Sequence, residues 1–187
     1  DSSGADAAHV DPVRLHIEDS GGGGRPVVLI HGWPLSAQAW EPQVSVLHAA
    51  GYRVVAYDRR GFGRSDKPES DYSYDTLADD LATVIEATGA RDATLVGFSM
   101  GGGEVARYMS RHGGKSVVKA VLISSVVPFM LKTSDNPSGT EPSKFGDMAQ
   151  ASLLEVDWRY YQDFMNVNLN GALLCARACV PRISTHS

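Results

Sequence analysis

Four short apolar runs recur along the chain, and each has the pattern of a β-strand. Residues 26–30, 53–57 and 117–123 are almost unbroken in apolar side chains, and residues 92–96 form another short run of strand type. Strands that are buried on both faces have this pattern, because neither face needs polar side chains. Residues 13–18 instead alternate apolar and polar positions, which predicts a strand with one exposed face.

Between these strands, apolar side chains recur at the spacing of a helix. One helix is predicted before Gly51 and a longer amphipathic helix before Gly89, since glycine commonly ends a helix. A third helix is predicted from residues 101–110. Buried strands that alternate with helices predict a doubly wound, mostly parallel α/β sheet covered on both faces. The residues at helical spacing are Trp40, Val44 and Leu47 in the first helix and Leu77, Leu81, Val84 and Ile85 in the second.

The other segments divide the chain into one core and two ends. Residues 1–12 are poor in apolar side chains, so we expect them to be disordered or a remnant of expression. Residues 13–134 form the predicted α/β core, and residues 135–187 are expected to be a helical C-terminal segment whose packing is not assigned. The four glycines at 21–24 predict a flexible hairpin turn, because a phosphate-binding loop would need a Gly-Lys-Ser/Thr ending.

Composition narrows the class of protein and its partners. The chain has 187 residues, of which 43% are hydrophobic and 21% charged, and its net charge is −5. These values are typical of one soluble domain and argue against nucleic acid or an anionic membrane surface as the main partner. The chain has neither an apolar stretch of the roughly 20 residues that span a membrane nor a signal-peptide pattern, so we expect a cytoplasmic location. Cys175 and Cys179 share one predicted helix face without further ligands, which favours packed thiols over a metal site.

Candidate chemistry is concentrated in the pentapeptide Gly-Phe-Ser-Met-Gly at residues 97–101. A G-x-S-x-G sequence between a strand and a helix predicts a nucleophile elbow, a tight turn that lifts the serine Oγ above the sheet. Gly97 and Gly101 are expected to keep Cβ atoms out of the close approach between that strand and that helix. Ser99 is therefore the predicted nucleophile.

A serine nucleophile also needs hydrogen-bond donors for the oxyanion of its tetrahedral intermediate. In an elbow, one donor is the backbone N–H of the next residue, here Met100, and the other comes from the loop after an earlier strand. Trp33, in the His-Gly-Trp-Pro turn at residues 31–34, is the candidate for the second donor. Residues 31–34, residues 58–65 and Ser99 all follow predicted strands, so we expect them to meet at one edge of the sheet. Residues 58–65 are expected to shape that edge without taking part in chemistry.

Three motifs together resemble those of a known family. Residues 31–36 (HGWPLS), 57–68 (YDRRGFGRSDKP) and 97–104 (GFSMGGGE) are similar to the corresponding segments of the α/β-hydrolase fold. More narrowly, they resemble the cofactor-free haloperoxidase/perhydrolase and aryl esterase group. The resemblance covers about residues 13–134 of the chain.

This resemblance implies a function and a set of site residues. It implies that Ser99 is the nucleophile, that Trp33 and Met100 are the oxyanion donors, and that small carboxylic esters are hydrolysed through an acyl-enzyme. It implies no metal, haem or other cofactor. Members of the group with Trp-Pro in the oxyanion turn are associated with perhydrolysis, in which a carboxylic acid and hydrogen peroxide give a peracid that oxidises halide. Trp33 and Pro34 therefore imply such a side activity.

The remaining members of the triad are not identified in the sequence. In this fold the acid and the histidine follow the serine on loops after two later strands, and the resemblance places them well over about 100 residues beyond it. Only 88 residues follow Ser99, so we expect the sheet to lack its last strands. His186 follows the serine late enough to be a candidate base, although no predicted strand positions it. We expect His31 to have a structural part and His112 to lie at a helix end, where it serves the helix dipole.

Two hypotheses for the function stay open. In the first, the chain is a serine esterase or perhydrolase that acts on a small ester or carboxylic acid, with its base at His186 or outside this sequence. In the second, it is a truncated, non-catalytic hydrolase-like protein that binds small acyl ligands or a protein partner, because an open sheet edge invites pairing. Neither hypothesis involves nucleic acid or membrane, and a homo-oligomer is left open.

Overall fold

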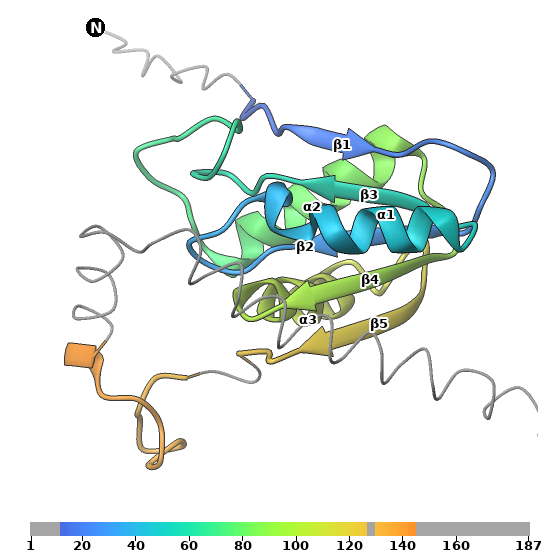
Figure 1. Cartoon of the computed structure of the whole chain (residues 1–187). Coiled ribbons are helices and arrows are strands. Elements are labelled where there is room, and N and C mark those ends of the chain that lie inside the picture. The colour runs from blue at the N-terminus through green and yellow to red at the C-terminus, as the bar shows by residue number, and fades with distance from the viewer. Residues whose placement is uncertain (1–11, 127–129, 145–187) are drawn as a thin grey trace, which may run out of the picture.

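Five strands form one sheet in the computed structural model, which describes residues 12–126 and 130–144 (Figure 1). In spatial order they are β1 (Ile17–Asp19), β3 (Arg53–Tyr57), β2 (Pro26–Ile30), β4 (Ala93–Phe98) and β5 (Val117–Ile123). β1 is antiparallel to β3, and the other neighbouring strands are parallel. The chain runs from β2 outward to β3 and then returns across β2 to β4, so the direction of winding reverses beside β2.

Helices on both faces of the sheet connect the parallel strands (Figure 1). The 3-10 turn η1 (Ala37–Trp40) and α1 (Glu41–Ala49) lie on one face, whereas α2 (Tyr74–Thr88) and α3 (Met100–Arg111) lie on the other. α2 begins where the Ser73 Oγ accepts a hydrogen bond from the Thr76 N–H at 3.2 Å. It ends before Gly89, whose φ of 61° is left-handed, as the sequence predicts.

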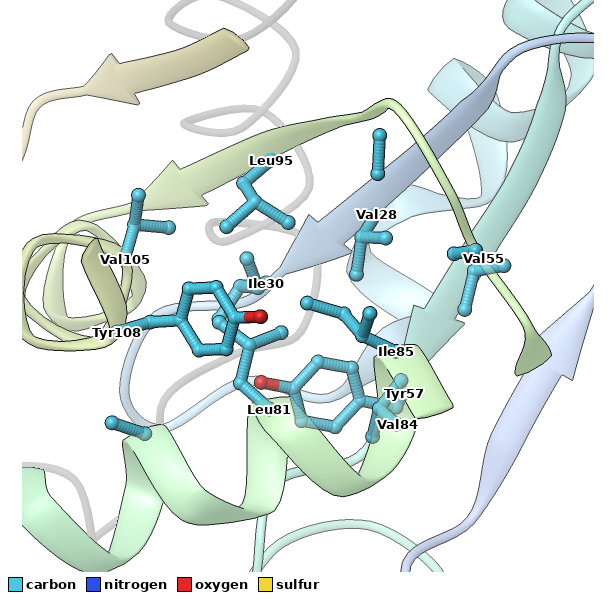
Figure 2. Close-up of a cluster of buried hydrophobic side chains, with 13 residues drawn as sticks. Val28, Ile30, Val55, Tyr57, Leu81, Val84, Ile85, Leu95, Val105 and Tyr108 are labelled. Atoms are coloured by element: carbon cyan, nitrogen blue, oxygen red, sulfur yellow. The ribbon is translucent and has the colours of Figure 1, made fainter. Parts of the chain in front are cut away.

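Alternate residues of the central strands supply two cores. Val28 and Ile30 of β2 face α2 and α3, where they pack among the side chains in Figure 2. Val27 and Leu29 of the same strand face η1 and α1 instead, in a second cluster around Trp40. This two-sided burial explains why the sequences of β2 and β3 are unbroken apolar runs.

The predicted α/β fold class and mostly parallel sheet are confirmed, and β2, β3 and β5 have the predicted bounds. The strand predicted at residues 13–18 is displaced, because only Ile17–Asp19 pairs with β3. The strand predicted at residues 92–96 begins one residue later, since Asp92 has a left-handed φ of 51°. It also continues to Phe98, which is paired with Ile123 of β5.

The hairpin turn predicted at residues 21–24 is wrong. These glycines join β1 to β2, but β1 pairs with β3, which lies between the two strands. The segment instead passes close to the turn between α1 and β3, where a Cβ on Gly24 would lie 2.0 Å from the carbonyl oxygen of Gly51. The sequence shows a break between two strands here but does not show which strand pairs with β1.

The predicted burial on both faces of the sheet is found for β2, β3 and β4 but not for β5. Only Ile123 of β5 is buried, and Val118 and Leu122 have exposed fractions of 52% and 48%. Within residues 12–126 and 130–144, β5 is the last strand of the sheet, and no strand pairs with its outer edge. This part of the chain also contains no helix that is long and apolar enough to cross a membrane.

Several predictions fall wholly or mostly outside the residues that the structure describes. They concern the N-terminal segment 1–12, most of the C-terminal segment 135–187, the pair Cys175 and Cys179, and the candidate base His186.

The close passage at Gly24 gives a test of the fold. We expect Gly24→Ala to lower the free energy of unfolding by about 2 kcal/mol or more, because its Cβ meets backbone that cannot rotate away. Gly23→Ala is the matched control, since a Cβ at Gly23 meets nothing within 4 Å, and its effect should stay within about 0.5 kcal/mol. Urea unfolding followed by circular dichroism measures both, and equal effects would contradict the described path of this segment.

Candidate active site

Ser99 is the single residue between the end of β4 and the start of α3, which confirms the predicted strand–turn–helix context. Its φ of 52° and ψ of −117° are unusual for a residue with a side chain and cost about 1–3 kcal/mol. Surrounding hydrogen bonds hold this conformation. The Ser99 N–H donates to the Ile123 carbonyl at 3.0 Å, and the Ser99 carbonyl accepts from the N–H groups of Gly102 at 3.0 Å and Val126 at 3.2 Å. The Ser99 side chain makes no capping hydrogen bond to α3.

Two glycines allow the elbow to form. A Cβ on Gly97 would lie 2.5 Å from the Gly101 carbonyl oxygen, and a Cβ on Gly101 would lie 2.4 Å from the Ile30 carbonyl oxygen. Real Cβ contacts are not this short, so any side chain at either position would push α3 away from β2 and β4. The expectation that these glycines serve a close approach is confirmed.

The turn at residues 31–34 packs directly against the elbow, so these two segments meet as the sequence predicts. A Cβ on Gly32 would lie 3.0 Å from the Ser99 Cβ and 3.0 Å from the Phe98 Cδ1. Trp33, the next residue, is half-buried, and its peptide bond to Pro34 is cis. Met100 is the first residue of α3 and is also half-buried. The two candidate oxyanion donors therefore come from segments that touch at Ser99.

His31 is fully buried beneath this turn, and both of its ring nitrogens are engaged. Its Nε2 accepts from the Arg59 N–H at 3.0 Å, so the proton is carried by Nδ1, which donates to the Gly32 carbonyl at 2.7 Å. Burial, reinforced by the nearby charge of Arg59, lowers the pKa of His31 from 6.5 to about 4. A neutral ring with both nitrogens occupied has a structural part, as expected.

The strand–loop segment at residues 58–65 also reaches this edge of the sheet, and its polar groups hold the loop and the segments around it. The two Asp58 carboxylate oxygens accept backbone N–H groups, from Ala37 at 2.7 Å and from Arg64 at 2.8 Å. The Ser65 Oγ donates to the Asp58 carbonyl at 2.5 Å. These bonds agree with the expectation that the segment shapes this edge of the sheet.

A buried ion pair joins this segment to α3. The Nε of Arg59 lies 2.7 Å from the Oε2 of Glu104, and the two side chains have exposed fractions of 1% and 0%. The Tyr57 hydroxyl donates to the other carboxylate oxygen of Glu104. Burial raises the pKa of Glu104, whereas the charge of Arg59 and the Tyr57 hydrogen bond act in the opposite direction.

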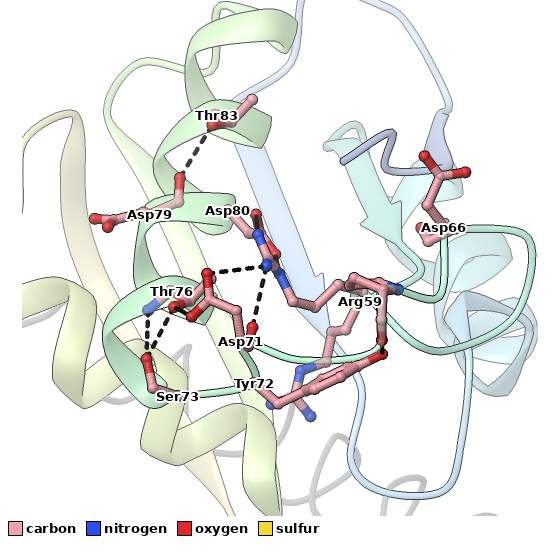
Figure 3. A network of polar contacts seen from close by, with 12 residues as sticks. Arg59, Asp66, Asp71, Tyr72, Ser73, Thr76, Asp79, Asp80 and Thr83 are labelled. Carbon is pink, nitrogen blue, oxygen red and sulfur yellow. Dashed lines mark hydrogen bonds and ion pairs between the residues drawn. The ribbon is translucent and has the colours of Figure 1, made fainter. Parts of the chain in front are cut away.

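The next residue, Arg60, forms a second buried ion pair, with a residue of α2 instead of α3. Arg60 donates from Nε and Nη2 to the two oxygens of Asp80 on α2, at 2.6 and 2.7 Å. Its Nη1 donates to the Asp71 carbonyl at 3.0 Å. Figure 3 shows Asp80 on α2 and the polar residues that precede this helix. This pair therefore fixes the loop before α2, not the turn beside Ser99.

The structure brings none of its other described histidines to Ser99. His112 directly follows α3, at the opposite end of that helix from Ser99, where it bonds Asp79 at 2.8 Å and stacks on Tyr108. His16 lies beside Glu18 at 3.4 Å, and His48 is on α1. His186 is not among the described residues. In residues 12–126 and 130–144, no group of three or more His, Cys, Asp or Glu side chains could hold a metal ion.

Sequence reasoning missed Glu104 and its partner Arg59. The signal was present, because Glu104 lies on the same face of α3 as the buried residues Gly101, Val105 and Tyr108. A single charge inside an apolar helical stripe needs a buried partner. The sequence alone does not show that this partner lies on the loop after β3.

Comparisons with known proteins match this chain to one family of proteins. The family model for the alpha/beta hydrolase fold matches residues 25–170. A non-heme chloroperoxidase of Kitasatospora aureofaciens is 46% identical over 145 residues, which cover 78% of this chain and 52% of the relative. A bifunctional esterase/perhydrolase of Acinetobacter calcoaceticus is 44% identical over 154 residues, covering 82% of this chain and 55% of the relative.

The solved structures agree with this result. The crystal structure of a bromoperoxidase from Bacillus anthracis superposes with a TM-score of 0.71 at 46% identity, covering 77% of this chain and 52% of that one. The chain thus spans about half the length of the relatives that it matches.

The buried histidine predicts a pH dependence of stability. The unfolded chain takes up a proton at His31 as the pH falls below about 6.5, whereas the folded chain does so only near pH 4. The contribution of His31 to the free energy of unfolding is therefore complete above pH 6.5 and falls by about 3 kcal/mol towards pH 4.

Urea unfolding between pH 7.5 and 4 measures this effect when wild type is compared with His31→Gln, which cannot titrate. The wild type should lose more stability over this range than the variant does. Parallel pH profiles would show that His31 is not held neutral in the fold.

Proposed function

We propose that this chain, which belongs to the alpha/beta hydrolase family, carries the nucleophile and oxyanion donors of a serine hydrolase for small carboxylic esters. The observation that carries the proposal is the backbone of Ser99, held at a φ of 52° between β4 and α3 with the turn of residues 31–34 against it. The esterase/perhydrolase relative supports the reaction class.

In the proposed reaction, the Ser99 Oγ attacks the carbonyl carbon of the ester, and its proton passes to a histidine base. The N–H groups of Met100 and Trp33 stabilise the oxyanion of the tetrahedral intermediate, and each such donor typically lowers the barrier by about 3–4 kcal/mol. The alcohol leaves with the proton from the histidine. Water then attacks the acyl-enzyme and releases the carboxylic acid.

The proposed reaction needs a histidine base for Ser99. His31 is excluded, because both ring nitrogens are bonded and its pKa is lowered to about 4. His186 remains the candidate within this sequence. The alternative is a histidine supplied by polypeptide that corresponds to the unmatched half of the relatives.

A perhydrolase side reaction uses the same acyl-enzyme. Hydrogen peroxide replaces water as the second nucleophile, so the acyl group leaves Ser99 as a peracid and the serine regains its proton. The chloroperoxidase and esterase/perhydrolase relatives support this activity, and Trp33 with Pro34 supplies the motif associated with it. The peracid then oxidises halide in solution, and the described residues need hold no redox cofactor for that step.

A non-catalytic function is the second candidate. Two observations favour it: none of the histidines in the described part of the chain reaches Ser99, and β5 has an unpaired outer edge there. In this case the exposed side chains of β5 bind a protein partner.

One experiment separates the two candidates. The full chain is incubated with a fluorophosphonate, and peptide mass spectrometry locates the adduct, while p-nitrophenyl acetate measures turnover. We expect an adduct on the peptide that contains Ser99 and turnover well above that of Ser99→Ala, because the elbow presents the hydroxyl to the phosphorus or carbonyl carbon. Absence of an adduct, together with turnover equal to that of Ser99→Ala, would favour the non-catalytic candidate.

A further inference from the structure

Glu104 anchors α3 to the interior of the protein at a point one helical turn beyond Met100. Its side chain is fully buried, and its Oε2 lies 2.7 Å from the Arg59 Nε. The Tyr57 hydroxyl at the end of β3 donates to Oε1. Any shift of α3 along its axis therefore moves Met100 and this carboxylate together.

Arg59 connects the same carboxylate to the turn on the other side of Ser99. The Arg59 backbone N–H donates to the His31 Nε2 at 3.0 Å, and its Nη1 lies 3.4 Å from the His31 carbonyl oxygen. His31 in turn donates from Nδ1 to the Gly32 carbonyl at 2.7 Å, one residue before Trp33. A continuous buried path thus runs from α3 to the turn of residues 31–34.

Fold stability alone does not account for a pair of this kind. Removing two charges from water costs hydration free energy, and their mutual attraction rarely exceeds this cost. Well-packed apolar side chains in the same place commonly stabilise a fold as much as a buried ion pair does. What the pair adds is a link between two segments, because the Arg59 guanidinium lies 2.7 Å from the Glu104 carboxylate and 3.4 Å from the His31 carbonyl oxygen. The pair links the turn of residues 31–34 to the start of α3, and these two segments supply the candidate oxyanion donors.

We propose that the Arg59–Glu104 ion pair sets the distance between the turn of residues 31–34 and the start of α3, which makes Arg59 and Glu104 positioning residues for the Ser99 site. The catalytic consequence rests on the proposed function, but the positioning itself does not. Neither side chain needs to touch the substrate. Both act through the placement of the Trp33 and Met100 N–H groups.

Glu104→Gln is the variant that isolates this role, with Asp80→Asn as its matched control. The glutamine keeps the shape of Glu104 and an oxygen for the Tyr57 hydroxyl but loses the charge that faces Arg59. Asp80→Asn weakens the neighbouring buried pair with Arg60 in the same way. That pair fixes the loop before α2 and has its further bond at Asp71. A general effect of losing one buried ion pair should appear in both variants.

Two measurements on the full chain test the proposal. The first is the rate of fluorophosphonate attachment to Ser99. The second is hydrogen–deuterium exchange, resolved by peptide, over residues 31–36 and 97–104. We expect Glu104→Gln to slow attachment by about ten-fold or more, since small misplacements of a site cost factors of this size. The same variant should speed exchange in both peptides, whereas Asp80→Asn should change each measurement less than about three-fold.

The outcomes distinguish this proposal from the proposed function. If the wild type takes up no phosphonate, the proposed function fails, and the exchange data alone decide the positioning role. Equal slowing in both variants, or unchanged exchange in Glu104→Gln, would overturn the proposal. If Glu104→Gln does not fold, Arg59→Lys replaces it, because lysine keeps the charge but loses the group that reaches the His31 carbonyl. The same two changes are then expected, and their absence overturns the proposal.

Discussion

The approach of α3 to the ends of β2 and β4, closer than side chains permit, is the constraint on which the rest of the site depends. A Cβ on Gly101 would lie 2.4 Å from the Ile30 carbonyl oxygen, and one on Gly97 would lie 2.5 Å from the carbonyl oxygen of Gly101 itself. With the helix this close, one residue must reverse the chain between strand and helix, and Ser99 takes the strained φ of 52°. Because β2 ends beside β4, the turn after β2 is pressed against that residue. The position of Ser99 therefore follows from backbone packing, before any side-chain chemistry is considered.

The same packing explains why charges are buried behind the site. Polar groups are buried where the loops after β2 and β3 meet the first turns of α3. These groups need partners within the protein. His31 meets this requirement as a neutral ring that accepts from the Arg59 N–H and donates to the Gly32 carbonyl. Arg59 and Glu104 meet it as an ion pair. The two hydrogen bonds of His31 satisfy groups that water cannot reach, and each of these contacts fixes one segment relative to another.

The sequence predicts those features that depend on local pattern or on a motif. β2 and β3 have the expected bounds, because burial on both faces requires an unbroken apolar run. The elbow is predicted because glycine is needed on both sides of Ser99. Features that depend on distant partners are not predicted, such as the pairing of β1 with β3 and the contact of Glu104 with Arg59. These partners lie more than 30 residues apart in the chain, and no local pattern specifies which of several loops will supply them.

Within this fold, the geometry of the nucleophile and the supply of its base are separate problems. Within residues 12–126 and 130–144, the hydrogen bonds of the Ser99 backbone and its close contact with Gly32 come from the segment between β2 and Val126, and none of them involves a histidine side chain. A serine with oxyanion donors but without its histidine still retains part of its catalysis, because stabilisation of the oxyanion does not need proton transfer. In the proposed reaction, the base changes the rate at which Ser99 reacts but not the position of the Ser99 backbone. The elbow and the turn of residues 31–34 therefore keep their arrangement whichever residue accepts the proton in the proposed reaction.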